Sequence, residues 1–177
     1  LYSILHLFGY DLSINDLKEF RKLGSITPGH PEKNVTPGIE VTTGPLGQGF
    51  ANGVGMAIAS KHLASRYNTE NFKIYDNNIY VMCGDGCLME GISNESASLA
   101  GHLNLDNLIV LYDDNNISID GSTELSFTEK TKEKYIALGW DVLTVESADS
   151  DLIEIDNAIL KARRSNKPSL ICMKTKI

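Results

Sequence analysis

The feature that most constrains the fold is a short apolar run that ends at Gly84-Asp85-Gly86 and is followed by a helical stretch. The run covers residues 79–83 and has the composition of a strand buried in a parallel sheet. A helix is expected over about 92–100. In open α/β sheets, ligands bind just beyond the carboxyl ends of such strands. Asp85 is therefore expected at a ligand site, where the flanking glycines leave room for a backbone approach and offer an N–H group to an anion.

A second apolar run, residues 108–112, leads directly into the sequence Asp-Asp-Asn-Asn at 113–116. If both runs are strands of one parallel sheet, their carboxyl ends share an edge, and Asp85 and Asn115 can face one ion. One carboxylate and one amide oxygen, with space for phosphate oxygens and water, suit Mg²⁺. Zinc would favour His or Cys ligands. The sequence therefore predicts a diphosphate site bridged by Mg²⁺.

The rest of the chain alternates between helical and strand patterns. Ser13 and Asp16 are placed to cap a helix that ends near Gly24, and Leu12 and Leu17 to form a hydrophobic staple. The alternation predicts an α/β fold, a doubly wound and mostly parallel sheet with helices on both faces. By length, residues 1–177 form a single domain. The further expected elements are a helix tail at 1–9, a helix that residues 44–49 open and that runs to about 66, helices at 127–138 and 151–165, and strands at 140–145 and 169–173.

Composition excludes several classes of function. The net charge is −7 and the pI is near 5.0, which argues against a nucleic-acid or anionic-membrane partner. An acidic protein that binds a diphosphate also needs a cation between the two. No stretch is long and apolar enough to span a membrane, and no signal peptide is evident. Three cysteines, an odd number, suit a reducing compartment, so we expect a cytoplasmic protein. The first residue is not Met, and we interpret the chain as a fragment of a longer protein.

Three segments carry a resemblance to a known family. Residues 27–31 read Thr-Pro-Gly-His-Pro, residues 42–49 read Thr-Thr-Gly-Pro-Leu-Gly-Gln-Gly, and residues 84–93 read Gly-Asp-Gly-Cys-Leu-Met-Glu-Gly-Ile-Ser. In this order and register they resemble the transketolase family, and Gly84-Asp85-Gly86 with Asn115-Asn116 resembles its thiamine diphosphate fingerprint. The resemblance implies thiamine diphosphate and Mg²⁺, which Ca²⁺ or Mn²⁺ can replace. It also implies sugar phosphate substrates, a homodimer and a place in the pentose phosphate pathway.

The resemblance also implies roles for individual residues. Asp85, Asn115 and the main-chain carbonyl of Ile117 would hold the metal, and Gly86 would offer its N–H to the diphosphate. Ile119 would pack on the thiazolium, and Gly44 and Leu46 would contact the aminopyrimidine through backbone groups. His30 would position substrate, and Glu90 would join a proton network at the subunit interface.

Other interpretations of these residues remain open. From spacing alone, His30 is an ordinary surface histidine, and Glu90 and Glu95 merely favour the positive end of a helix. Gly47, Gly49 and Gly53 come close to a dinucleotide-binding pattern, but the spacing is one residue too long. The small residues at 49, 53 and 57 indicate either tight internal packing or a subunit contact.

Rival functions also remain. Dihydroxyacetone synthase shares these motifs closely. Other thiamine diphosphate enzymes share Gly84-Asp85-Gly86 and the Asn pair but not the blocks at 27–31 and 44–49. A non-catalytic cofactor-binding or assembly module could also retain the fold. The family's other cofactor domain supplies the Glu that activates the aminopyrimidine, and that domain is not in this sequence. We therefore expect the isolated chain to be inactive.

Overall fold

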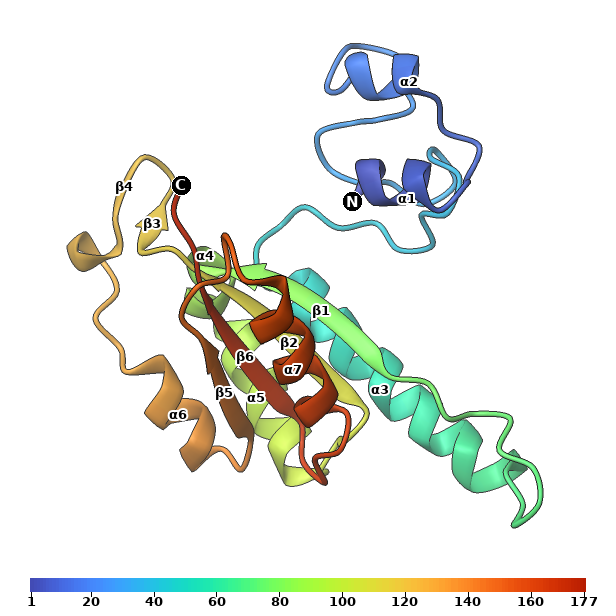
Figure 1. Ribbon diagram of the computed structural model, residues 1–177, viewed down its shortest axis with the longest axis vertical. Helices are drawn as coiled ribbons and strands as arrows, with labels where there is room; N and C mark the ends of the chain where they lie inside the picture. Colours follow the sequence, from blue (N-terminus) through green and yellow to red (C-terminus); the bar gives the residue numbers. More distant parts are fainter. The chain divides into compact units, whose positions relative to one another are not determined.

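A computed structural model describes residues 1–177, which fall into two compact units, Leu1–Pro45 and Leu46–Ile177. Figure 1 shows two short helices in the first unit, and the sheet with its surrounding helices in the second.

The first unit contains the helices α1 (Tyr2–Leu7) and α2 (Ile14–Lys18) and a small core around Leu5, Leu12 and Ile39. The predicted capping box is confirmed, because the Ser13 hydroxyl accepts from the Asp16 N–H while the Asp16 carboxylate accepts from the Ser13 N–H. Leu17 packs against the same core, as the staple requires.

The prediction that this helix continues to Gly24 is wrong. The helix α2 ends at Lys18, and Arg21 adopts a left-handed conformation with φ of 65°. The Arg21 N–H bonds to the carbonyl of Thr27, so the chain turns there instead of continuing the helix. Phe20 and Leu23 are consequently exposed and form no apolar face.

The second unit is built on four parallel strands, and this confirms the predicted fold class (Figure 1). The order across the sheet is β1-β2-β6-β5, and each connection between successive strands of the sheet contains at least one helix. The central strands β2 and β6 are almost fully buried, which explains their continuous apolar sequences. The bounds are β1 Ile79–Gly84, β2 Leu108–Asp114, β5 Asp141–Val145 and β6 Ser169–Lys174.

Helices bury two separate apolar clusters against this sheet. Those that share the larger cluster are α3 (Gln48–Tyr67), α5 (Gly91–His102) and α6 (Thr131–Ala137), and α7 (Leu152–Ala162) contributes to the smaller one. Trp140 anchors the larger cluster, where its indole N–H donates to the carbonyl of Ala97. Two of these helices are shorter than predicted: α6 lacks residues 127–130 and 138, and α7 lacks residues 151 and 163–165.

The small residues of α3 pack internally. Gly53 and Ala57 are buried, and a Cβ built on Gly53 would lie 2.2 Å from Cγ2 of Val81 in β1. Helix and strand therefore approach more closely here than any side chain at position 53 would permit. Of the two interpretations of the small-residue pattern, the internal one holds for these positions.

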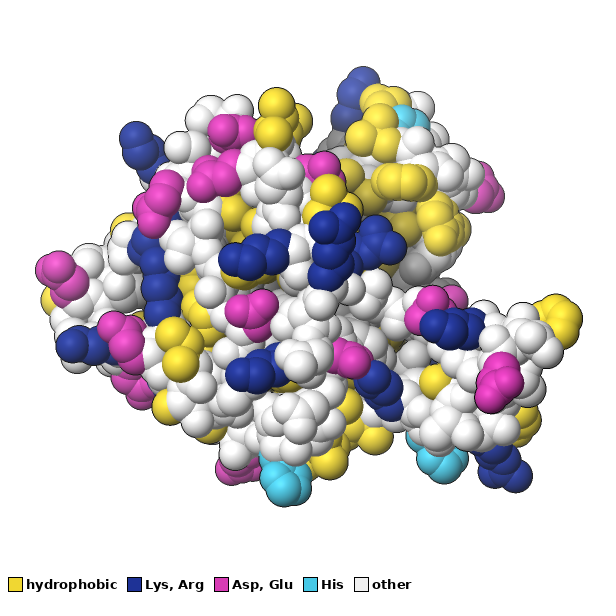
Figure 2. Space-filling view, turned by 60° about the horizontal axis from the view of Figure 1, so that its bottom comes forward, with side chains coloured by type: hydrophobic (Ala, Val, Ile, Leu, Met, Phe, Trp, Pro, Cys, Tyr) yellow, Lys and Arg dark blue, Asp and Glu magenta, His cyan; other side chains and the backbone are white.

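The surface mixes both signs of charge. On the face drawn in Figure 2, Lys and Arg side chains are interspersed with Asp and Glu, and neither sign forms a continuous field. No helix combines the length and apolar character needed to cross a membrane.

Candidate functional site

The two predicted ligand segments meet at one edge of the sheet. The strands β1 and β2 pair in parallel with Gly84 opposite Asp113, so both strands end at the same edge of the sheet. Asp85 then follows directly after β1, and Asn115 directly after β2. The structure therefore confirms that the carboxyl ends of the two strands bring these residues to one edge.

The glycine turn that the sequence suggested is a short helix, α4 (Asp85–Met89). Gly84 is its extended N-cap, and Asp85 and Gly86 occupy its first turn, where backbone N–H groups have no acceptor inside the helix. A Cβ built on Gly86 would lie 3.2 Å from Cδ1 of Leu46 and 3.5 Å from Oγ of Ser118. Two segments therefore approach the backbone of Gly86, and the missing side chain keeps that backbone accessible.

Asp85 is a buried carboxylate with one oxygen left without a partner. Only 4% of the residue is exposed, and its Oδ1 accepts a hydrogen bond of 2.5 Å from the hydroxyl of Tyr112. Its Oδ2 is buried and has no hydrogen-bond donor. Burial raises the pKa of Asp85, and the bond from Tyr112, together with the nearby N–H groups of Asn115 and Asn116, partly offsets that rise. A buried acceptor of this kind is costly unless a donor or a cation satisfies it.

The neighbouring carboxylates at this edge are already paired. Asp114 forms an ion pair of 2.6 Å with Lys174 on β6. Asp113 accepts from the hydroxyl of Thr175 and from the side-chain amide of Asn115 at 3.1 Å. Among the three, only Asp85 has a buried side-chain oxygen without a partner.

The segment after Asn115 is a strained hairpin. The side-chain oxygen of Asn115 accepts from the N–H of Ile117 at 2.9 Å and so shapes the start of β3 (Ile117–Ser118). This strand pairs with β4 (Gly121–Ser122), which the 3₁₀ helix η1 (Thr123–Leu125) follows. Asn116 and Ile119 both have φ of 62°. A left-handed conformation is unusual for a β-branched residue, and the side chain of Ile119 is 98% exposed. Strain and exposure of this kind cluster at ligand sites.

Two further predicted residues lie together in the first unit. His30 is exposed, and a Cβ built on Gly44 would lie 2.9 Å from Cγ of His30. The imidazole therefore rests against the backbone of Gly44, where only glycine leaves it room.

Glu90 and Glu95 are both exposed. Glu90 is the N-cap of α5, and its main-chain carbonyl, rather than its carboxylate, accepts from Ser93 and Asn94. The interface role of Glu90 stays a prediction.

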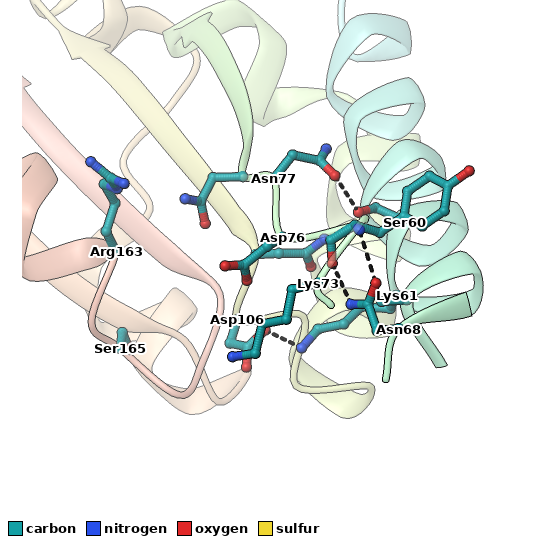
Figure 3. A pocket seen from close by; sticks show the side chains of 13 residues that line it. Ser60, Lys61, Asn68, Lys73, Asp76, Asn77, Asp106, Arg163 and Ser165 are labelled. Atoms are coloured by element: carbon teal, nitrogen blue, oxygen red, sulfur yellow. Dashed lines mark hydrogen bonds and ion pairs between the residues drawn. The ribbon is translucent and has the colours of Figure 1, made fainter. Parts of the chain in front are cut away.

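Two cavities lie at opposite ends of the strands. One of about 220 Å³ adjoins Asp85 at the carboxyl edge and is lined also by Tyr112, Asp114 and Lys174. The other, about 420 Å³, is lined by residues that precede β1, β2 and β6 (Figure 3). There the Lys61–Asp106 ion pair and the Ser60 to Asn77 hydrogen bond pair four of the lining groups, whereas Oδ1 of Asn107 has no partner. Ligands of parallel sheets bind at the carboxyl edge, so the smaller cavity marks the site.

The chemistry available at this edge excludes a zinc-type centre. No group of three or more His, Cys, Asp or Glu side chains is placed to hold a metal ion. The three cysteines form no disulfide, and burial raises the pKa of Cys172 to about 11 and that of Cys83 further still, so these two thiols are inert fillers. The groups that could hold a cation here are the Asp85 carboxylate, neutral protein oxygens and the oxygens of a bound small molecule.

The comparisons with known proteins agree with this geometry. The family model described as "Transketolase, thiamine diphosphate binding domain" matches residues 1–177. Over the full length of this chain, the sequence is 60% identical to Transketolase 1 of Saccharomyces cerevisiae and 57% identical to the transketolase of Bacillus subtilis. It spans about a quarter, 26%, of both relatives.

Solved structures give the same result. The chain superposes on transketolase from Leishmania mexicana with a TM-score of 0.96 at 55% identity, covering 98% of this chain and 26% of that one. A Pichia stipitis transketolase in complex with sedoheptulose 7-phosphate has a TM-score of 0.96 at 56% identity, with the same coverage. Fold and site thus define a thiamine diphosphate-binding α/β domain. More particularly, the chain belongs to the transketolase family, as its thiamine diphosphate-binding domain.

Sequence reasoning did not find Tyr112 or the Lys174–Asp114 pair. Tyr112 looks like one more apolar member of a strand, and only the parallel pairing of Cys83 with Tyr112 places it beside the residue that begins α4. The signal that could have found it is its polar tip, because a buried tyrosine hydroxyl usually has a partner.

Proposed function

We propose that this chain holds the diphosphate end of thiamine diphosphate through Mg²⁺, within a transketolase. The reaction is the transfer of a two-carbon ketol unit from a ketose phosphate such as xylulose 5-phosphate to an aldose phosphate such as ribose 5-phosphate. Bound thiamine diphosphate would supply the carbon–carbon bond chemistry. The residues of this chain would bind and orient it, with Asp85, Asn115 and the carbonyl of Ile117 as metal ligands and Gly86 as a donor to the diphosphate.

The observation that carries this proposal is the unpartnered Oδ2 of Asp85. It is buried, lies at the carboxyl edge of a parallel sheet, and has Asn115 after the neighbouring strand. A hard cation that prefers carboxylate and amide oxygens fits this donor set, and Mg²⁺ commonly uses one or two protein carboxylates together with substrate phosphates. Ca²⁺ and Mn²⁺ have similar ligand preferences.

The remaining roles follow the family resemblance. We infer that Gly44 and Leu46 contact the aminopyrimidine, that His30 positions the sugar phosphate, and that Glu90 belongs to a proton network at a homodimer interface. The exposure of His30 and Glu90 leaves both available for contacts with substrate or with a second subunit. A cytoplasmic location and a part in the pentose phosphate pathway belong to the same proposal.

The test compares two proteins with the same two sugar phosphates. A full-length protein that contains this chain should convert xylulose 5-phosphate and ribose 5-phosphate when thiamine diphosphate and Mg²⁺ are present, measured by product chromatography. The isolated chain should give no turnover above buffer. Turnover by the isolated chain would contradict the expectation that residues outside it complete the active centre.

Replacing the acceptor separates the rival enzyme. Formaldehyde used in preference to ribose 5-phosphate would identify a dihydroxyacetone synthase. Cofactor binding without turnover of either acceptor in the full-length protein would identify a non-catalytic module.

Ile119 should show a trade-off between stability and cofactor binding. Ile119→Gly relieves a left-handed conformation that costs a side-chain-bearing residue about 1–2 kcal/mol, offset by about 0.5–1 kcal/mol of added unfolded-state entropy. The metal-free chain should therefore unfold at equal or slightly higher urea concentration. Cofactor affinity should fall about 10-fold or more, because an isoleucine buried by a ligand contributes about 1.5–3 kcal/mol.

The matched control is Ile153→Ala, which removes another exposed isoleucine, on α7. Its cofactor affinity, measured by the same equilibrium dialysis of the full-length protein, should equal that of the parent. Unchanged affinity in Ile119→Gly would remove Ile119 from the site.

A further inference from the structure

Tyr112 is placed to control how Asp85 presents its two oxygens. It lies on β2 opposite Cys83 of β1, and only 3% of it is exposed. Its hydroxyl crosses to α4 and donates to Oδ1 of Asp85 at 2.5 Å. Hydrogen bonds from a hydroxyl to an ionised carboxylate are stronger than those between neutral groups.

The bond fixes a torsion that is otherwise loose. The last torsion of an aspartate side chain is broad, so the plane of a free carboxylate can take many orientations. With one oxygen held by Tyr112, the orientation of the plane is fixed, and the other oxygen has no donor. A ligand oxygen must be held to within a fraction of an ångström for tight binding, and such partners orient metal ligands in many proteins.

The nature of the donor also matters. Lys174 neutralises the charge of Asp114, because its Nζ lies 2.6 Å from Oδ2 of Asp114. A phenol is a neutral donor, so Tyr112 holds Asp85 in place without cancelling the negative charge that attracts a cation. Of the carboxylates at this edge, the one with the neutral, buried donor is also the one with an unpartnered oxygen.

We propose that Tyr112 is a positioning residue for the cation, because it orients Asp85 with Oδ2 toward the metal and preserves its charge. This inference rests on the proposed Mg²⁺-bridged diphosphate site. It differs from a purely structural role, in which Asp85 would serve only to satisfy a buried tyrosine hydroxyl.

The test is Tyr112→Phe in a full-length protein that contains this chain, which removes one hydroxyl and keeps the ring. Mg²⁺ is titrated at saturating thiamine diphosphate and binding is followed calorimetrically. The Mg²⁺ dissociation constant should rise about 10- to 100-fold, the range typical for loss of a residue that orients a metal ligand. At saturating Mg²⁺, kcat should return to within about three-fold of the parent value, since the ligands themselves remain.

The matched control is Tyr135→Phe, at another tyrosine that is 3% exposed in the same core cluster. Its Mg²⁺ affinity should equal that of the parent. In an Asp85→Asn background, Tyr112→Phe should cause no further loss of Mg²⁺ affinity, because the residue through which it acts is already changed.

The outcomes separate this inference from the proposed function. Parent-like Mg²⁺ affinity in a folded Tyr112→Phe protein overturns the positioning role and leaves the metal site intact. A parent protein that binds thiamine diphosphate equally well without Mg²⁺ overturns the proposed site itself. If Tyr112→Phe does not fold, 4-aminophenylalanine at position 112 keeps the shape of the side chain and replaces the hydroxyl by a weaker donor. Lower Mg²⁺ affinity is then expected, and unchanged affinity overturns the inference.

Discussion

Asp85→Asn in a full-length protein that contains this chain is expected to weaken Mg²⁺-dependent thiamine diphosphate binding by about 10²- to 10³-fold. The substitution keeps the size of the side chain and removes its charge. Removing one partner of a buried charge pair costs about 3–5 kcal/mol, and each 1.4 kcal/mol is about ten-fold in affinity. Equilibrium dialysis of labelled thiamine diphosphate at fixed Mg²⁺ measures the change directly.

Loss of folding would give the same result for the wrong reason, so metal-free stability is measured in parallel. Asn at position 85 can still accept the bond from Tyr112, and it no longer places an unpartnered charge in a buried position. The variant should therefore unfold at the same or a higher urea concentration than the parent. A weaker Mg²⁺ dependence with parent-like affinity would show that another residue holds the cation.

Gly53→Ala is expected to give the largest loss of stability among single methyl additions in α3. The new Cβ would lie 2.2 Å from Cγ2 of Val81, a stiff β-branched residue in the strand that leads to Asp85. Overpacking of a close-packed core costs about 1–3 kcal/mol. Urea unfolding followed by far-UV circular dichroism should show an earlier transition.

Gly55→Ala is the matched control in the same helix. Gly55 is exposed, and a Cβ there meets no atom within 4 Å. This substitution should stabilise the chain by about 0.5–1 kcal/mol, because alanine is the better helix former. Equal effects of the two substitutions would contradict the close contact between α3 and β1.

Much of the second unit follows from local sequence patterns. The strands β1, β2 and β6 are predicted because strands of parallel sheets read as continuous apolar runs. The parallel pairing of β1 with β2 puts Asp85 and Asn115 at one edge. The small residues at 53 and 57 indicated a close approach without identifying the partner. Only the structure shows that the partner is Val81 of β1.

Other features depend on contacts between distant residues, which local patterns do not encode. The helix α2 stops early because Arg21 bonds to Thr27, and nothing in the apolar spacing of Leu17, Phe20 and Leu23 indicates this. The partner of Asp85 is invisible for the same reason, since Tyr112 is 27 residues away. The left-handed backbone of Ile119 contradicts the preference of its own side chain.

The central claim is that a cation bridges this edge of the sheet to a diphosphate. The most direct test is a calorimetric titration of thiamine diphosphate into a full-length protein that contains this chain, first with Mg²⁺ and then with EDTA. We predict saturable binding with Mg²⁺ that EDTA abolishes and that Mg²⁺ in excess restores. Equal affinity in the presence of EDTA, or no binding with Mg²⁺, would contradict the claim.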